Sequence, residues 1–145
     1  MRNIGIVEGN SPVSDNDWES VKKKGDKAIQ EWIDGQLHGR SVTIVLIGEN
    51  TAGRKWINYE IEKSWNLGKG VVGIYIHNLK NKDGIQAKKG SNPFAAFTIG
   101  TDKKKMTDIV KAYDPPYSTS TNVYDHIKAN LSKWVEEAIE IRNKY

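Results

Sequence analysis

The chain has 145 residues, which is long enough for one domain with its own hydrophobic core. Hydrophobic residues make up 37% and charged residues 28%, and no apolar run approaches the roughly 20 residues of a membrane helix. Residues 1–10 lack the apolar core of a secretory signal, and a chain without cysteine has neither disulfides nor thiolate metal sites. We therefore expect a cytoplasmic globular protein with no membrane partner.

The net charge is +4, from 22 lysines and arginines against 18 acidic residues. The simplest interpretation of this excess is a solvated surface rich in lysine. The alternative is attraction of an anionic ligand, either a nucleotide or a nucleic acid. Nucleic acid is not expected as a partner.

The first part of the chain predicts a short strand, a turn-rich loop and a helix. Residues 3–7 are strand-like, and residues 8–17 are rich in Gly, Asn, Ser, Pro and Asp, which favour turns. Residues 18–37 carry apolar side chains at helical spacing and predict a helix. Gly25 weakens that helix by about 1 kcal/mol relative to alanine.

Residues 41–78 predict the unit around which the rest of the fold is arranged. Two nearly continuous apolar runs, 42–47 and 71–76, are typical of parallel strands that are covered on both faces. The helical segment 54–67 lies between them and ends at Gly68. This order of strand, helix and strand predicts a βαβ unit with a right-handed crossover.

Ligands of open α/β sheets bind beyond the carboxyl ends of the strands. That edge is reached by residues 49–54, by the first turns of the helix and by His77. On the helix, Ile57, Ile61 and Trp65 recur every four residues, so we expect these three side chains to face the sheet.

The second half of the chain predicts less regular structure before a final helix. Residues 78–92 form a polar, lysine-rich loop. Residues 93–99 are predicted to be a last, edge strand, since their proline falls at the start. Residues 122–142 carry a continuous apolar stripe at helical spacing and predict the final helix.

Several familiar motifs match by letters only or not at all. The pattern G-x-G-x-x-G at residues 68–73 precedes a strand, whereas a dinucleotide fingerprint follows a strand and opens a helix. The histidines His38, His77 and His126 are too dispersed to indicate a zinc site. Neither a Walker loop nor a Gly-x-Ser-x-Gly elbow occurs.

Glu60 lies on the central helix and has two interpretations. On composition alone it is an exposed helix glutamate. Its position near the ligand-binding edge favours a carboxylate that hydrogen-bonds ribose hydroxyls or stabilises an oxocarbenium-like centre while an N-glycosidic bond breaks. Trp56, four residues earlier, is either a face on which an aromatic ring stacks or a half-buried helix anchor.

Residues 41–78 resemble the central part of a TIR-like domain, and most of all those of the bacterial Thoeris anti-phage systems and their relatives. The residues that carry the resemblance are 43–48 (TIVLIG), Thr51, 54–61 (RKWINYEI) and 70–77 (GVVGIYIH). TIR enzymes carry a tryptophan four residues before the catalytic glutamate of this helix, and Trp56 and Glu60 have that spacing. The resemblance covers roughly residues 3–97.

The resemblance implies a three-layer, flavodoxin-like α/β fold with a parallel sheet, and cleavage of NAD as a substrate without a metal or other cofactor. In the Thoeris relatives the product is a cyclic ADP-ribose isomer that signals to a partner effector. The implied function is therefore an NAD hydrolase or ADP-ribosyl cyclase of anti-phage defence, with Glu60 as the catalytic carboxylate.

The resemblance also implies where the substrate binds. Residues 10–17 would border the nicotinamide ribose, and the same loop often mediates assembly of TIR domains, so we expect a homo-oligomer. The expected substrate-binding residues are Asp15, Asn50, Thr51, Trp56 and His77.

Family members begin with a strand and a helix before the point at which this chain starts. Either the true start lies upstream or the chain is a shortened member, in which residues 3–7 correspond to the family's second strand. We predict a single domain over residues 1–145, with a core at 3–100 and a C-terminal helical extension at 101–145.

Two other classes of protein remain as alternatives. A non-catalytic TIR-like module that assembles with itself or with a partner would fit the missing first strand and the basic, tryptophan-rich composition. A flavodoxin or receiver-like domain is disfavoured, because no Ser/Thr-Gly-rich phosphate loop follows residues 3–7 and no acidic pair ends a strand.

Overall fold

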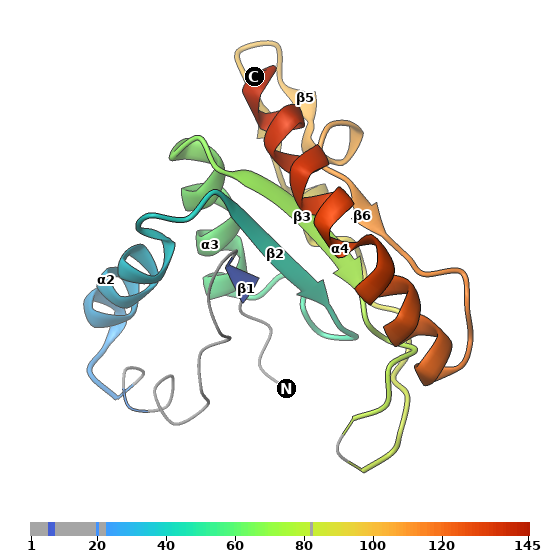
Figure 1. Ribbon diagram of the computed structural model, residues 1–145. Helices are drawn as coiled ribbons and strands as arrows, with labels where there is room; N and C mark the ends of the chain where they lie inside the picture. Colours follow the sequence, from blue (N-terminus) through green and yellow to red (C-terminus); the bar gives the residue numbers. More distant parts are fainter. Residues whose placement is uncertain (1–5, 8–19, 21–22, 82) are drawn as a thin grey trace.

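A computed structural model describes residues 6–7, 20, 23–81 and 83–145 of the chain. Over these residues the main sheet has the strand order β1-β2-β3-β6 (Figure 1). Strands β2 (Val42–Ile47), β3 (Gly70–Tyr75) and β6 (Ala112–Tyr113) run parallel, and β1 (Ile6–Val7) pairs antiparallel with β2. With helices on both faces, this is a three-layer, flavodoxin-like α/β fold, as predicted.

The central βαβ unit is confirmed, and its predicted bounds are within one residue of those observed. Helix α3 (Lys55–Asn66) connects β2 to β3, which pair in register from Val42 with Gly70 to Ile47 with Tyr75. Because successive strand residues point to opposite faces, one alternate set packs on α3 and the other on the C-terminal helix. Both strands are therefore nearly continuously apolar.

Helix α3 lies on the sheet through the predicted residues. Ile57 and Ile61 are buried, and Trp65 packs against the same core cluster while keeping part of its ring at the surface. Phe94, which follows in the chain after β3, fills the same layer and is fully buried.

Helix α2 (Asp26–Leu37) covers α3 instead of the sheet. Its buried side chains Ile29, Ile33 and Leu37 pack with rings of α3. The predicted helix over 18–37 is wrong as one continuous element, because Gly25 precedes Asp26 with a φ of 95°. That left-handed backbone, which glycine adopts at little cost, begins the helix afresh.

Helix α4 (Ser120–Asn143) confirms the predicted final helix, and it covers the face of the sheet opposite to α3 (Figure 1). The backbone of α4 comes so close to β3 that a Cβ on Gly70 would lie 2.8 Å from the Ala138 carbonyl carbon. The segment predicted as an extension thus supplies one of the three layers. The division of the domain at residue 100 stays a prediction.

The predicted edge strand at residues 93–99 is wrong. Its first part is the 3-10 helix η1 (Pro93–Ala96), and its end, β4 (Thr98–Ile99), pairs with β5 (Lys104–Lys105) in a separate two-stranded sheet. The physical reason lies in Asn92, whose side chain accepts a 2.9 Å hydrogen bond from the Phe94 amide and so starts a helical turn.

The place beside β3 goes instead to β6, which pairs through Gly73 with Ala112 and Ile74 with Tyr113. A second 3-10 helix, η2 (Met106–Asp108), leads toward it and buries Met106 in the core. Among the helices that the structure describes, none is both long enough and apolar enough to cross a membrane.

Candidate active site

The loop between β2 and α3 is closed by its own hydrogen bonds. The Thr51 hydroxyl accepts from the Gly48 amide at 2.8 Å and lies 3.4 Å from the Leu46 carbonyl oxygen, to which it donates. Thr51 is fully buried, whereas Asn50 is exposed and its carbonyl accepts from Arg54 Nε at 2.8 Å. The structure therefore gives Thr51 a role in shaping the loop and leaves the Asn50 side chain at the surface.

Glu60 is only 3% exposed, so the interpretation as an exposed surface glutamate is wrong. It sits in the middle of α3, where Ile57 and Ser64, at helical spacing, and the next residue, Ile61, are buried as well. Taking a carboxylate out of water is costly unless its surroundings compensate. A buried carboxylate at this position is therefore the kind of feature that marks a functional site.

Trp56 lies one turn before Glu60, at the contact between α3 and α2. It packs against the cluster of Ile33 and its neighbours on α2. The Lys55 ammonium lies 4.8 Å from the ring centroid, and the Tyr59 ring meets it edge-on at 5.7 Å. This environment is that of the half-buried anchor, and stacking with a substrate stays a prediction.

His77 lies just after β3, the strand that pairs with β2. Its ring stands edge-on to Tyr75, with 6.2 Å between the centroids. Its Nδ1 atom is buried and has no hydrogen-bond partner among the residues that the structure describes. The remaining predicted residue, Asp15, lies outside the described residues.

One feature of this edge went unpredicted: residues 87–90, here called the strap, cross the carboxyl ends of β2 and β3. The Ala87 amide donates to the His77 carbonyl at 2.9 Å, and the Lys88 amide donates to Glu49 Oε1 at 3.1 Å. At Gly90 an ideal Cβ would overlap the Gly48 carbonyl oxygen. The strap thus closes the edge over these two strands, and only glycine fits its end.

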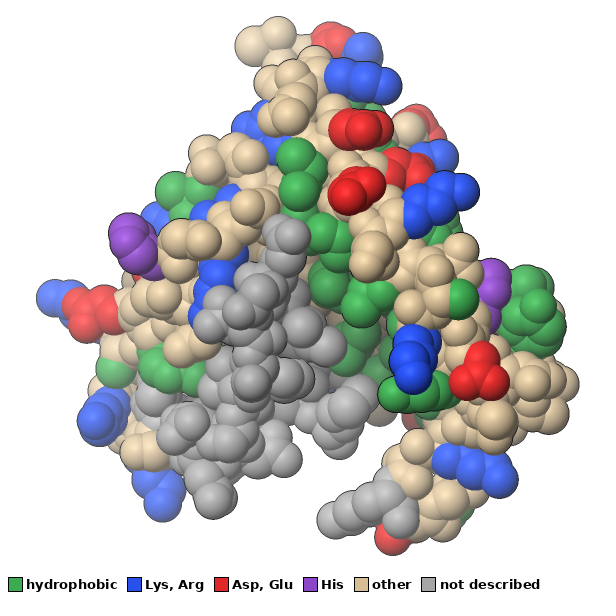
Figure 2. All heavy atoms as spheres, in the orientation of Figure 1, with side chains coloured by type: hydrophobic (Ala, Val, Ile, Leu, Met, Phe, Trp, Pro, Cys, Tyr) green, Lys and Arg blue, Asp and Glu red, His purple; other side chains and the backbone are tan. Residues whose placement is uncertain are grey.

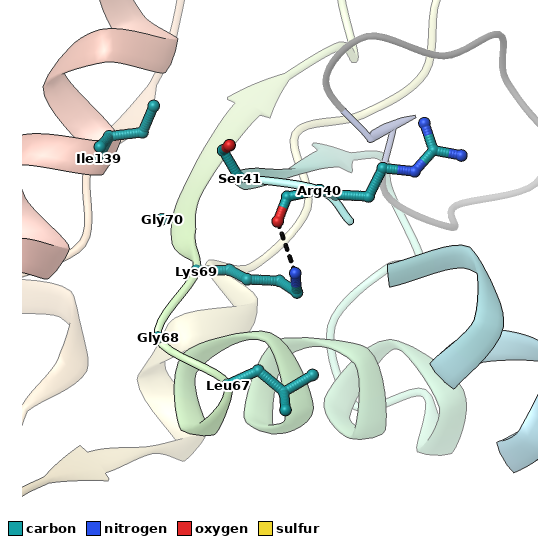
Figure 3. A pocket seen from close by; sticks show the side chains of 7 residues that line it. All are labelled: Arg40, Ser41, Leu67, Gly68, Lys69, Gly70 and Ile139. Atoms are coloured by element: carbon teal, nitrogen blue, oxygen red, sulfur yellow. Dashed lines mark hydrogen bonds between the residues drawn. The ribbon is translucent and has the colours of Figure 1, made fainter. Parts of the chain in front are cut away.

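A pocket of about 300 Å³ lies at the opposite edge, beside the amino ends of β2 and β3 (Figure 3). Its lining residues are Arg40, Ser41, Leu67, Gly68, Lys69, Gly70 and Ile139. The Lys69 ammonium donates to the Arg40 carbonyl, while the Arg40 guanidinium points away from it (Figure 3). Burial, followed by the charge of Arg40, lowers the pKa of Lys69.

On the face that Figure 2 shows, the described charged side chains do not single out a docking surface. On the side shown in Figure 2, acidic and basic side chains lie among one another over the described part of the surface. This arrangement agrees with the interpretation of the net charge as a solvated surface.

The parallel sheet between layers of helices defines the class as a flavodoxin-like α/β domain. Residues 1–81, more than half of the chain, match the family described as "Thoeris protein ThsB, TIR-like domain". The chain belongs to this family, as the resemblance indicated.

A relative from Bacillus cereus (strain MSX-D12), named "Putative cyclic ADP-D-ribose synthase ThsB1", is 47% identical over 91 residues. The match covers 61% of this chain and 47% of that protein. The chain thus matches about half the length of this relative.

Proposed function

We propose that the chain cleaves NAD, as a hydrolase or as an ADP-ribosyl cyclase that makes a cyclic ADP-ribose-type signal in anti-phage defence. The observation that carries the proposal is Glu60, which is 3% exposed on the crossover helix, one turn after Trp56. Membership of the Thoeris family and the name of the B. cereus relative, a cyclic ADP-D-ribose synthase, support the same reaction class.

The reaction breaks the bond between the ribose C1′ and the nicotinamide nitrogen. The bonding electron pair leaves with nicotinamide, which becomes neutral, and positive charge develops on C1′ and the ring oxygen. The Glu60 carboxylate would stabilise that charge, and its burial strengthens the effect because the local dielectric constant is low. Water then attacks C1′ in hydrolysis, or a nucleophile of the same ADP-ribose in cyclisation, and the attacking group loses its proton.

The other expected site residues take narrower parts in the proposal. Asn50, exposed in the loop after β2, and His77, after β3, would contact the substrate. Thr51 would act indirectly, by holding the loop in shape. Since NAD and phage infection are both found in the cytoplasm, we place the reaction there, with a homo-oligomer as the active form and an effector that reads the nucleotide signal.

The decisive experiment compares two carboxamide variants of α3. Glu60→Gln keeps the size of the side chain and removes its charge. We expect the rate of NAD cleavage, measured by chromatography of the products, to fall by about 10²–10³-fold. Glu62→Gln alters an exposed glutamate of the same helix and should cleave NAD like the parent. Parental activity in Glu60→Gln would refute the mechanism.

A non-catalytic interaction module is the second candidate. It is favoured by large apolar side chains that remain exposed among the described residues, namely Leu67, Ile85, Tyr117, Tyr124 and Tyr145. Such a module would form oligomers or bind a partner while leaving NAD intact. Size-exclusion chromatography over a range of concentrations, with NAD measured in the same samples, separates the two candidates.

A further inference from the structure

Two buried hydroxyl groups meet between the sheet and the crossover helix. Thr43 Oγ1 of β2 and Ser64 Oγ of α3 lie 2.8 Å apart, and both residues are fully buried. The hydrophobic cluster of this layer is made of apolar side chains such as Val45 and Ile61. An apolar pair of the same size would have filled this space without any polar group to satisfy.

The bond differs in kind from the apolar contacts beside it. Burial of Ile57 and Ile61 holds α3 on the sheet, but apolar contact is non-directional and tolerates small rotations and shifts. A hydrogen bond weakens steeply when its distance or angle departs from the optimum. The hydrogen bond between Thr43 and Ser64 joins the side chains of α3 and the sheet in this directional way.

Ser64 is placed so that this constraint reaches Glu60. The two residues are four apart on α3, so they share one side of the helix, with about 6 Å of helix rise between them. Any rotation of α3 that broke the bond would swing the Glu60 carboxyl through the same angle. Displacement of a reacting group by 1 Å can lower a rate by about 10²-fold.

We infer that Thr43 and Ser64 are positioning residues, which fix the rotation of α3 on β2 and thereby the place of the Glu60 carboxyl. The inference rests on the proposed function of Glu60. Both residues are fully buried, and neither is assigned a contact with the substrate. The pair acts through the helix that carries Glu60.

The test uses two substitutions of Thr43, one that removes its hydroxyl group and one that removes its methyl group. Thr43→Val keeps the shape and removes the hydroxyl, whereas Thr43→Ser keeps the hydroxyl and removes a methyl group. We expect Thr43→Val to lower kcat for NAD about 10- to 100-fold with KM changed by less than about twofold, and Thr43→Ser to stay near the parent. Ser64→Ala should behave like Thr43→Val.

If Thr43 acted only by packing, Thr43→Ser would lower kcat more than Thr43→Val, since the smaller serine leaves a cavity and valine does not. Val72→Ala is the matched control, because Val72 is buried in the cluster against α4, on the other face of the sheet. It should destabilise the protein and leave kcat unchanged at a temperature at which the variant stays folded.

Amide hydrogen exchange gives a readout that does not need activity. We expect the amides of α3 to exchange at least about fivefold faster in Thr43→Val than in the parent, with no such change in Thr43→Ser. A parent that does not cleave NAD would overturn the proposed function. An active parent whose Thr43→Val variant keeps the parental kcat and the parental exchange of α3 would leave that function standing and overturn the positioning role.

Discussion

At the scale of single residues, Gly90 of the strap is the described glycine that leaves the least room for a side chain. Gly90→Ala would place a methyl group against the backbone carbonyl of Gly48, which cannot move without disturbing the loop after β2. We expect the free energy of unfolding, measured with urea, to fall by about 1–3 kcal/mol.

The control for this substitution is another glycine with room around it. Gly35 lies inside α2, and an ideal Cβ there meets nothing within 4 Å. Gly35→Ala should raise the free energy of unfolding by about 0.5–1 kcal/mol, because alanine favours helix. Equal effects of the two substitutions would contradict the close approach of the strap to Gly48.

Tyr59 is the residue whose ionisation should couple to stability. Burial, followed by the hydrogen bond that its hydroxyl donates to Asp34 at 2.7 Å, raises the pKa of Tyr59 from 10.0 to about 12. Between these values the unfolded chain loses the phenolic proton more readily than the folded chain. The contribution of Tyr59 to stability is therefore complete below pH 10 and is lost as the pH rises toward 12.

The measurement compares the parent with Tyr59→Phe, since other groups titrate in the same range. The difference in unfolding free energy between the two proteins should shrink from pH 10 to pH 12. A titration followed by phenolate absorbance should show one tyrosine fewer near pH 12 in the variant than in the parent. A constant difference across this range would count against the bond to Asp34.

At the scale of elements, the last turn of α4 is joined to the end of α3. Arg142 donates from Nε and Nη2 to the Trp65 carbonyl at 3.0 and 2.9 Å, and its guanidinium lies 4.5 Å from the Trp65 ring centroid. The same carbonyl accepts from the Gly68 amide at 3.0 Å, so the arginine adds charged donors to a carbonyl in the last turn of α3.

Removal of this connection should weaken the fold. Arg142→Ala should lower the free energy of unfolding by about 1.5–3 kcal/mol, the range for hydrogen bonds to charged groups. Lys133→Ala, an exposed position on the same helix, should change it by less than about 0.5 kcal/mol. Urea unfolding of both variants tests the point, and similar losses in the two would contradict it.

At the scale of the whole molecule, the helices and the strap cover the parallel sheet on several sides. Helix α4 covers one face of the parallel sheet, α3 covers the other, and α2 lies on α3. The strap closes the carboxyl ends of β2 and β3. Both faces of the sheet and the carboxyl ends of its two central strands are therefore covered.

Much of this architecture follows from short stretches of sequence. The apolar runs of β2 and β3 and the four-residue spacing on α3 are properties of consecutive residues, so they predict the elements without knowledge of the fold. The spacing of Trp56 and Glu60 is equally local, and it was enough to place a candidate carboxylate on the crossover helix.

The two mistaken elements turn on local features, the Asn92 cap and the backbone of Gly25, whereas the parts that were missed depend on residues far apart in the chain. Strand β6 has two residues and exists only through its pairing with β3. Thr43 and Ser64 are 21 residues apart, and Glu49 lies 39 residues before Lys88, so neither contact leaves a trace in local pattern. The burial of Glu60 belongs with these, because exposure is set by whatever packs around a side chain, whereas periodicity reports only which way that side chain points along its own helix.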